Sequence, residues 1–95
     1  MTKANEIILI TINGMDRPGV TAALTEILAN NNAVILDIGQ ADIHNQLSLG
    51  ILFQCTEENS GNILKELLFK SYELDVNIRF SPISEAEYSE WVGMQ

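Results

Sequence analysis

The first apolar run of the sequence constrains the fold more than any other feature. The segment Glu6–Ile12 is short and rich in β-branched residues, which is typical of a buried strand. Apolar side chains occupy positions of both parities along it, so both faces of this strand should be covered. One layer of helices covers only one face of a sheet. We therefore expect the second face to meet another domain or subunit.

The strand leads through Asn13-Gly14-Met15-Asp16-Arg17-Pro18-Gly19 into an amphipathic helix of about residues 18–30. Pro18 suits a first helical turn, and Asp16 can accept hydrogen bonds from the amides there. Gly14 and Gly19 have no Cβ, so the backbone at these positions can turn sharply or lie against a ligand. The spacing alone favours an ordinary capped turn. The alternative is that free amides at the helix N-terminus receive a small anion such as a carboxylate.

Composition limits the classes of function. The 95 residues are enough for one small domain with a single core. A formal net charge of −8 argues against nucleic acid and anionic membranes as partners. The lone Cys55 excludes an internal disulfide, and no apolar run reaches the length of a membrane span. We expect a soluble protein in the cytoplasm.

The remaining elements complete the order β-α-β-β-α-β. Strands are expected at about residues 33–43, 47–56 and 75–82, and a second helix at about residues 61–73. The short polar reversal Asn45-Gln46 makes the second and third strands an antiparallel hairpin. This order predicts an α+β, ferredoxin-like βαββαβ sandwich, in which a four-stranded antiparallel sheet of order 4-1-3-2 carries two helices on one face.

The sequence also predicts the roles of individual residues in the hairpin and in the second helix. Gly39 and Gly50 interrupt the hairpin and indicate a bulge or a close backbone approach. The buried stripe of the second helix is expected to be Ile63 or Leu64, Leu67, Leu68 and Tyr72.

The C-terminal segment reads as a short separate helix. Ser84 and Glu87 have the spacing of a capping box, and Tyr88, Trp91 and Val92 then fall on one face. This face has no packing partner in the predicted sandwich. We therefore divide the chain into a domain of residues 1–82 and a linker helix of residues 83–95, and we expect the helix to lead into a longer protein.

The sequence contains no recognisable set of catalytic or metal-binding residues. One histidine and one cysteine cannot supply a nucleophilic triad or a paired-cysteine metal site, and His44 is interpreted as a solvated or turn-capping imidazole. Asp37 and Asp42 are five residues apart on one strand, so they point to opposite faces and form no carboxylate pair. We expect no catalytic residue, no metal ligand and no cofactor in this chain.

The strand–Gly14–Met15–Asp16–Arg17–Pro18–Gly19–helix signature, with its β-β-α-β remainder, resembles the ACT domain family of small-molecule regulatory modules. The resemblance covers residues 6 to about 82. More specifically, the stretches 35–41, 43–44 and 47–52 are similar to the N-terminal ACT region of bacterial phosphoserine phosphatases. The tail Tyr88–Gln95 is similar to the segment that joins one ACT unit to the next part of those enzymes.

The resemblance implies a site and a partner. ACT domains pair, often sheet edge to sheet edge, and bind an amino acid beside the first strand–helix loop. It thereby implies a homodimer and the ligand-binding residues Asn13, Gly14, Met15, Asp16, Arg17, Pro18 and Gly19. Serine or glycine is the natural effector for an enzyme of L-serine biosynthesis.

The catalytic part of such phosphatases has no counterpart here. Their haloacid dehalogenase-like domain needs an Asp-x-Asp nucleophile motif, a lysine and Mg²⁺-binding aspartates, and the nearest imitation, Asp75-Val76-Asn77, falls in the expected fourth strand. We therefore expect a non-catalytic regulatory domain, with Mg²⁺ needed only by the missing catalytic domain. The alternatives are a structural dimerisation module without a ligand and a free-standing ACT regulator of amino-acid metabolism.

Overall fold

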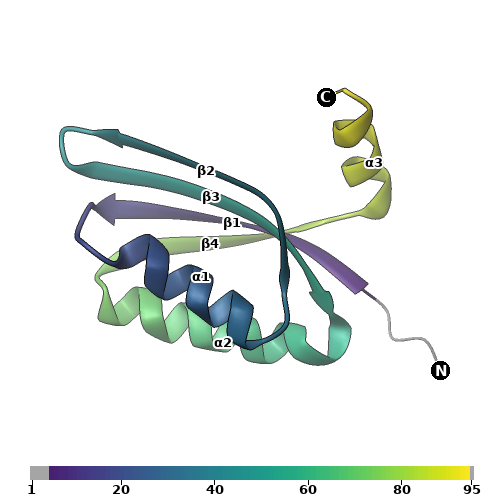
Figure 1. Cartoon of the computed structure of the whole chain (residues 1–95), viewed down its shortest axis with the longest axis horizontal. Helices are drawn as coiled ribbons and strands as arrows, with labels where there is room; N and C mark the ends of the chain where they lie inside the picture. Colours follow the sequence, from purple (N-terminus) through teal and green to yellow (C-terminus); the bar gives the residue numbers. More distant parts are fainter. Residues whose placement is uncertain (1–4, 95) are drawn as a thin grey trace.

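A strand that is paired along both sides forms the centre of the sheet. The computed structural model describes residues 5–94, with Glu85 described by its backbone alone (Figure 1). Residues 1–4 and Gln95, which the expected units 1–82 and 83–95 include, lie outside the described residues. In chain order the elements are β1 (Asn5–Met15), α1 (Val20–Asn30), β2 (Val34–Ile43), β3 (Gln46–Thr56), α2 (Glu57–Glu73), β4 (Val76–Ile83) and α3 (Glu85–Gly93).

The sheet has the order β2-β3-β1-β4, and every neighbouring pair is antiparallel. This confirms the predicted ferredoxin-like sandwich with β1 in the centre. Helices α1 and α2 lie side by side on one face of the sheet (Figure 1). The other face is left uncovered except where α3 approaches it. None of the helices within residues 5–94 is long and apolar enough to cross a membrane.

The core fills the space between the sheet and its two covering helices. The side chains of Ile8, Ile10 and Ile12 on β1 are buried under the helices, whereas Leu9 and Thr11 alternate with them on the uncovered face. Buried apolar side chains from the other elements complete this core: Val20, Leu24, Leu28, Leu47, Leu49, Ile51, Phe53, Cys55, Ile63, Leu67 and Val76.

The second helix starts earlier than predicted, at Glu57, and its buried stripe is rotated. The side chain of Thr56 caps the helix by accepting a hydrogen bond from the backbone amide of Asn59, so the first helical residue lies four residues before the expected start. The buried residues are Ser60, Ile63, Leu67 and Ser71. The prediction of Leu68 and Tyr72 as core residues is therefore wrong, because these side chains are 55% and 89% exposed.

The β2–β3 hairpin also differs in detail. His44 and Asn45, with φ of 51° and 64°, form its two-residue turn, so the reversal lies one residue earlier than predicted. A bulge does occur in β2, but it lies between Ile35 and Asp37. Gly39 and Gly50 face each other in regular register, and a Cβ on either would meet nothing within 4 Å. These glycines therefore mark neither a bulge nor a close approach.

Helix α3 stands apart from the core, since none of its residues belongs to the buried apolar cluster. Ser84 caps it by accepting a hydrogen bond from the amide of Glu87, as the capping box predicts. The helix follows β4 and lies away from α1 and α2 (Figure 1). Tyr88 and Trp91 are half-buried, and they line a cavity together with residues of the uncovered sheet face. Val92 is 46% exposed.

Gly14 provides a first test of the packing between β1 and β4. It pairs with Val76, and a Cβ on Gly14 would lie 2.8 Å from Val76 Cγ1 and 3.2 Å from Val76 Cα. Gly14→Ala should therefore lower the free energy of unfolding by about 1–3 kcal/mol, measured by denaturant titration. Gly50→Ala, whose added methyl meets nothing, should stay within about 0.5 kcal/mol of the parent.

Truncating the opposing side chain checks the cause. Adding Val76→Ala to Gly14→Ala removes the clashing methyl groups, so the double variant should be more stable than the sum of the two single changes predicts. Purely additive effects would show that the two positions are not in steric conflict.

Candidate functional site

The junction between β1 and α1 is a tight turn followed by a helix without a side-chain cap. Gly19 has φ 89° and ψ −3°, and the amide of Val20 donates to the carbonyl oxygen of Arg17 over 3.4 Å. Proline followed by glycine at the two central positions, with these angles at the glycine, defines a type II β-turn. Pro18 thus belongs to the turn, and the helix starts after it at Val20.

Gly19 is also the N-cap residue of α1. Its carbonyl oxygen accepts the amide hydrogen of Ala23 over 2.9 Å, but glycine has no side chain with which to cap the free amides. Within the described residues no side chain caps α1 and no acidic residue lies in its first turn. The prediction that Asp16 caps this helix is therefore wrong. The start of α1 keeps its partial positive charge and open amides, which favours an anion.

A cavity of about 400 Å³ lies against this helix start. It is lined by Asp16, Arg17, Pro18, Gly19, Val20, Thr21, Ala22 and Gln40. Thr21 Oγ1 donates to Gln40 Oε1 over 2.9 Å, and Gln40 Nε2 donates to Asp42 Oδ2 over 3.1 Å. A hydrogen-bonded chain therefore joins the first turn of α1 to two side chains of β2.

Two carboxylates meet at the far end of that chain. The backbone amide of Asp16 donates to the carbonyl oxygen of Asn45 over 2.8 Å, which ties the end of β1 to the β2–β3 turn. Partial desolvation raises the pKa of Asp16 above its ordinary 3.8, and the charge and hydrogen bonding of the Asp42 carboxyl raise it further. The lining of the cavity thus combines a positive helix start with the carboxyl of Asp16, which Asp42 contacts from outside the lining.

The seven residues predicted for the site do not all lie in the loop. β1 extends to Met15, so Asn13, Gly14 and Met15 belong to the strand and only the other four residues follow it. Asp16, Arg17, Pro18 and Gly19 line the cavity together. Asn13 lies on the opposite face of the sheet, because it alternates with the buried residues of β1, and it lines a separate hollow with Thr11, Asn77, Ile78 and Arg79. Gly14 packs against Val76, and Met15 is 53% exposed. Ligand binding by these residues stays a prediction.

Sequence reasoning missed Thr21, Gln40 and Asp42. The register supplies the signal: Gln40 pairs with Leu49 and Asp42 with Leu47, so both point to the face that carries α1. Asp37 pairs with Leu52 and points to the opposite face, as predicted for the two acids. Within residues 5–94, no group of three or more His, Cys, Asp or Glu side chains is arranged to hold a metal ion.

The antiparallel βαββαβ sandwich is the ferredoxin-like arrangement, which many unrelated functions share, so the fold alone does not identify the family. The sequence model of the ACT domain family matches residues 6–81. The chain therefore belongs to the ACT domain family, whose members are regulatory rather than catalytic modules.

Two kinds of relatives share its sequence. The phosphoserine phosphatase SerB2 of Mycobacterium tuberculosis is 48% identical over 48 residues, which are 50% of this chain and only 12% of that enzyme. The UPF0237 protein MK1213 of Methanopyrus kandleri is 32% identical over 80 residues, which are 82% of this chain and 84% of that protein. The UPF0237 protein MMP0657 of Methanococcus maripaludis is 29% identical and is covered over 91% of its length.

Solved structures agree on the fold. A protein described as a glycine cleavage system transcriptional repressor superposes with a TM-score of 0.80 at 20% identity, covering 84% of this chain and 47% of that one. An ACT domain protein from Streptococcus pneumoniae superposes with a TM-score of 0.70 at 22% identity, covering 81% of this chain and 89% of that one. At these identities the likeness establishes the fold alone.

The coupling between the two acids can be tested by titration. Asp42→Asn should lower the pKa of Asp16 toward 3.8, because it removes the neighbouring charge, and NMR titration of the side-chain carboxyl carbons measures this. Asp37→Asn makes the same charge change on the opposite face of β2 and should leave the pKa of Asp16 unchanged.

The same coupling has a consequence for stability. A pKa raised by folding means that the folded protein holds the proton of Asp16 more tightly, so the contribution of Asp16 to stability declines as the pH rises from 3.8 through its folded-state pKa. The decline should be smaller in Asp42→Asn. An equal decline in both proteins would show that Asp42 is not its cause.

Proposed function

We propose that this ACT domain is a regulatory module that binds a small amino acid, serine or glycine, beside the loop between β1 and α1. The observation that carries the proposal is the start of α1, which has neither a side-chain cap nor an acidic residue in its first turn. An amino-acid carboxylate would supply the acceptor that the chain itself does not provide.

The charges around the cavity match a zwitterion. The ammonium group of the ligand would lie toward Asp16, with Asp42 behind it, and would offset both the desolvation and the repulsion by Asp42 that raise the pKa of Asp16. The open amides and the guanidinium of Arg17 favour the carboxylate. Arg17 is only weakly held by Asp75, since their closest atoms are 3.9 Å apart and both side chains are at least half exposed.

The loop site belongs, in our proposal, to a homodimer formed along the β2 edge of the sheet. β2 is an edge strand of ten residues, so one side of its backbone lacks a sheet partner in the described chain. Four large apolar side chains of β2 are exposed: Val34 (57%), Ile35 (39%), Ile38 (45%) and Ile43 (69%). The opposite edge, β4, carries Pro82, which cannot donate to a further strand.

Two settings for such a module have support. The identity to SerB2 supports a regulatory ACT domain of a phosphoserine phosphatase in L-serine biosynthesis, with residues 1–82 as the ACT unit and 83–95 as a linker. Catalysis and Mg²⁺ would then reside in a haloacid dehalogenase-like domain beyond this chain. The match along most of the UPF0237 proteins supports a free-standing ACT regulator. In either setting we expect a cytoplasmic protein, consistent with the buried, unpaired Cys55.

Calorimetric titration with serine and glycine tests the loop site. Gly19→Ala should weaken binding about tenfold or more, because its methyl enters the open space at the helix start and alanine resists a φ of 89°. Asp16→Asn should also weaken binding, since it removes the charge proposed for the ammonium group. Glu26→Gln, an exposed charge change elsewhere on α1, should bind as the parent does.

Stability must be measured on the same samples. Gly19→Ala is expected to cost about 1–2 kcal/mol from the positive φ alone, and Gly19→Asn less, because asparagine tolerates this conformation. Binding by Gly19→Asn at the parent affinity would rule out close approach of the ligand to this backbone. If the parent binds no amino acid at all, the structural dimerisation module becomes the better interpretation.

The proposed β2 interface can be tested separately by light scattering. The parent should be a dimer at micromolar concentration, and Ile38→Lys should shift it toward monomer, because a charge on an edge strand opposes pairing. Phe69→Lys introduces the same charge at an exposed apolar position on α2 and should remain dimeric. A monomeric parent, or dissociation by Phe69→Lys alone, would overturn the assignment of β2.

A further inference from the structure

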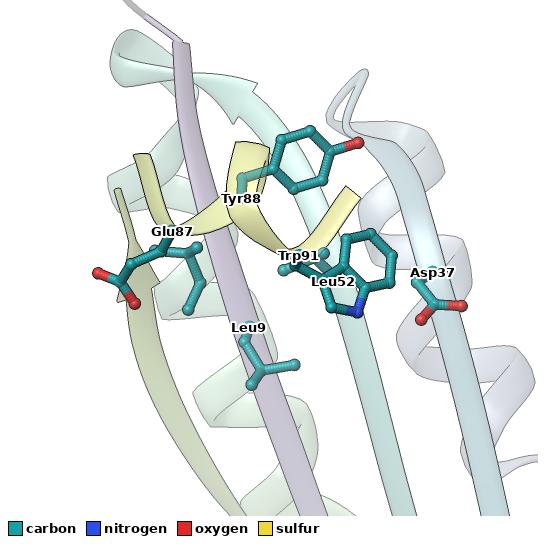
Figure 2. A pocket seen from close by; sticks show the side chains of 7 residues that line it. Leu9, Asp37, Leu52, Glu87, Tyr88 and Trp91 are labelled. Carbon is teal, nitrogen blue, oxygen red and sulfur yellow. The ribbon is translucent and has the colours of Figure 1, made fainter. Parts of the chain in front are cut away.

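A second cavity lies on the opposite side of the sheet from the loop site, between α3 and the uncovered face. Its volume is about 300 Å³, at the small end of the range for small-molecule sites. It is lined by Leu9, Asp37, Leu52, Ile83, Glu87, Tyr88 and Trp91. Figure 2 shows the floor of this cavity on β1, β3 and β2, with the two aromatic rings of α3 beside it.

The floor is one row of residues across three strands. Leu9 pairs with Leu52, and Leu52 pairs with Asp37, so the three side chains lie next to one another on the same face. Both leucines are half-buried. An apolar surface therefore ends in a single carboxylate at the β2 edge.

The β2 bulge is what brings Asp37 to this face. Ile35 pairs with Phe53, so regular pairing would set Asp37 opposite the buried Ile51. The extra residue in the bulge shifts Asp37 by one position, to Leu52 on the uncovered face. Its Oδ1 accepts the amide hydrogen of Ile38 over 3.0 Å, and Oδ2 retains acceptor capacity. The carboxylate is thereby fixed beside the cavity.

The aromatic wall comes from α3. Tyr88 and Trp91 are three residues apart on one face of the helix, with ring centroids 5.8 Å apart and planes inclined by 35°. In Figure 2 the indole nitrogen of Trp91 lies on the edge of the ring turned toward Asp37, whereas the carboxylate of Glu87 points away from the two rings. Glu87 Oε1 also accepts the hydroxyl hydrogen of Ser84 over 3.1 Å. Asp37 is therefore the acid best able to meet a ligand.

We propose that this cavity binds a small organic cation, a protonated amine with an apolar body and no carboxylate. The leucines and Ile83 would cover the apolar body, the ring faces would attract the cation, and Asp37 would pair with it. No lysine or arginine of the described chain lines the cavity. A ligand carboxylate would thus lie near Asp37 without a counter-ion, so this site should reject the amino acids proposed for the loop site.

The single tryptophan of the chain makes the site directly observable. Trp91 lies in the cavity wall, so a ligand there should change its emission. The probe is phenethylamine, which carries an ammonium group on a phenyl body. Its matched comparisons are phenylalanine, which adds a carboxylate, and 2-phenylethanol, which lacks the charge. We expect a saturable change with phenethylamine and binding at least about fivefold weaker for each comparison compound.

Variants decide whether the binding uses this cavity. Asp37→Asn keeps the shape of the side chain and should weaken phenethylamine binding about fivefold, while 2-phenylethanol binding stays unchanged. Glu90→Gln makes a similar charge change on α3 outside the cavity and should bind as the parent does. Asp16→Asn, on the far side of the sheet, should also leave phenethylamine binding intact, which separates this site from the loop site.

Three results would overturn the proposal. One is the absence of saturable binding of phenethylamine both in Trp91 emission and in an NMR titration of the same sample. Another is binding of phenylalanine as tight as that of phenethylamine. The third is an unchanged affinity of phenethylamine for Asp37→Asn.

Discussion

The pairing of β1 along both of its sides is the constraint on which the structure depends. β1 hydrogen-bonds to β3 and β4 at once, while Ile8, Ile10 and Ile12 carry the sheet against α1 and α2. Full burial of one such side chain contributes about 1.5–3 kcal/mol, so these three form the part of the core that β1 itself supplies. Both candidate cavities are attached to this strand: the loop cavity follows its C-terminal end, and Leu9 forms part of the floor of the second cavity.

The turn after β1 connects this rigid centre to the loop site. Because Gly19 takes a positive φ, the chain leaves the sheet and enters α1 within a few residues, and no side chain is available to cap the helix. A serine or aspartate at the N-cap would satisfy the helix with its own oxygen. Glycine leaves the amides open, so a turn that is locally suboptimal for the helix is suited to an external acceptor.

The strand order and the core could be predicted from the sequence because they follow from periodicity. β1 has apolar side chains on both of its faces, and it is the central strand as predicted. In β3 and β4 the alternation of apolar and polar residues predicted correctly which side chains are buried. Errors arose where a single residue changes the geometry. Thr56 starts α2 before the expected cap. The buried face of α2 includes the small polar residues Ser60 and Ser71 in place of Leu68 and Tyr72, which hydrophobicity alone did not indicate. The bulge before Asp37 leaves no composition signal, and the approach of Asp42 to Asp16 depends on a hairpin register that spacing alone does not fix.

The two cavities differ in the charge that each can accept, and the sheet keeps them apart. The loop cavity combines open helix amides, Arg17 and acidic side chains, so it matches a ligand that carries both charges. The cavity under α3 offers aromatic faces and Asp37 without a basic residue among its described lining, so it matches positive charge alone. In a chain of net charge −8 the general field attracts cations to both sites. The difference between them comes from Arg17 and from the start of α1, which has no side-chain cap, whereas Ser84 caps the start of α3 beside the second cavity.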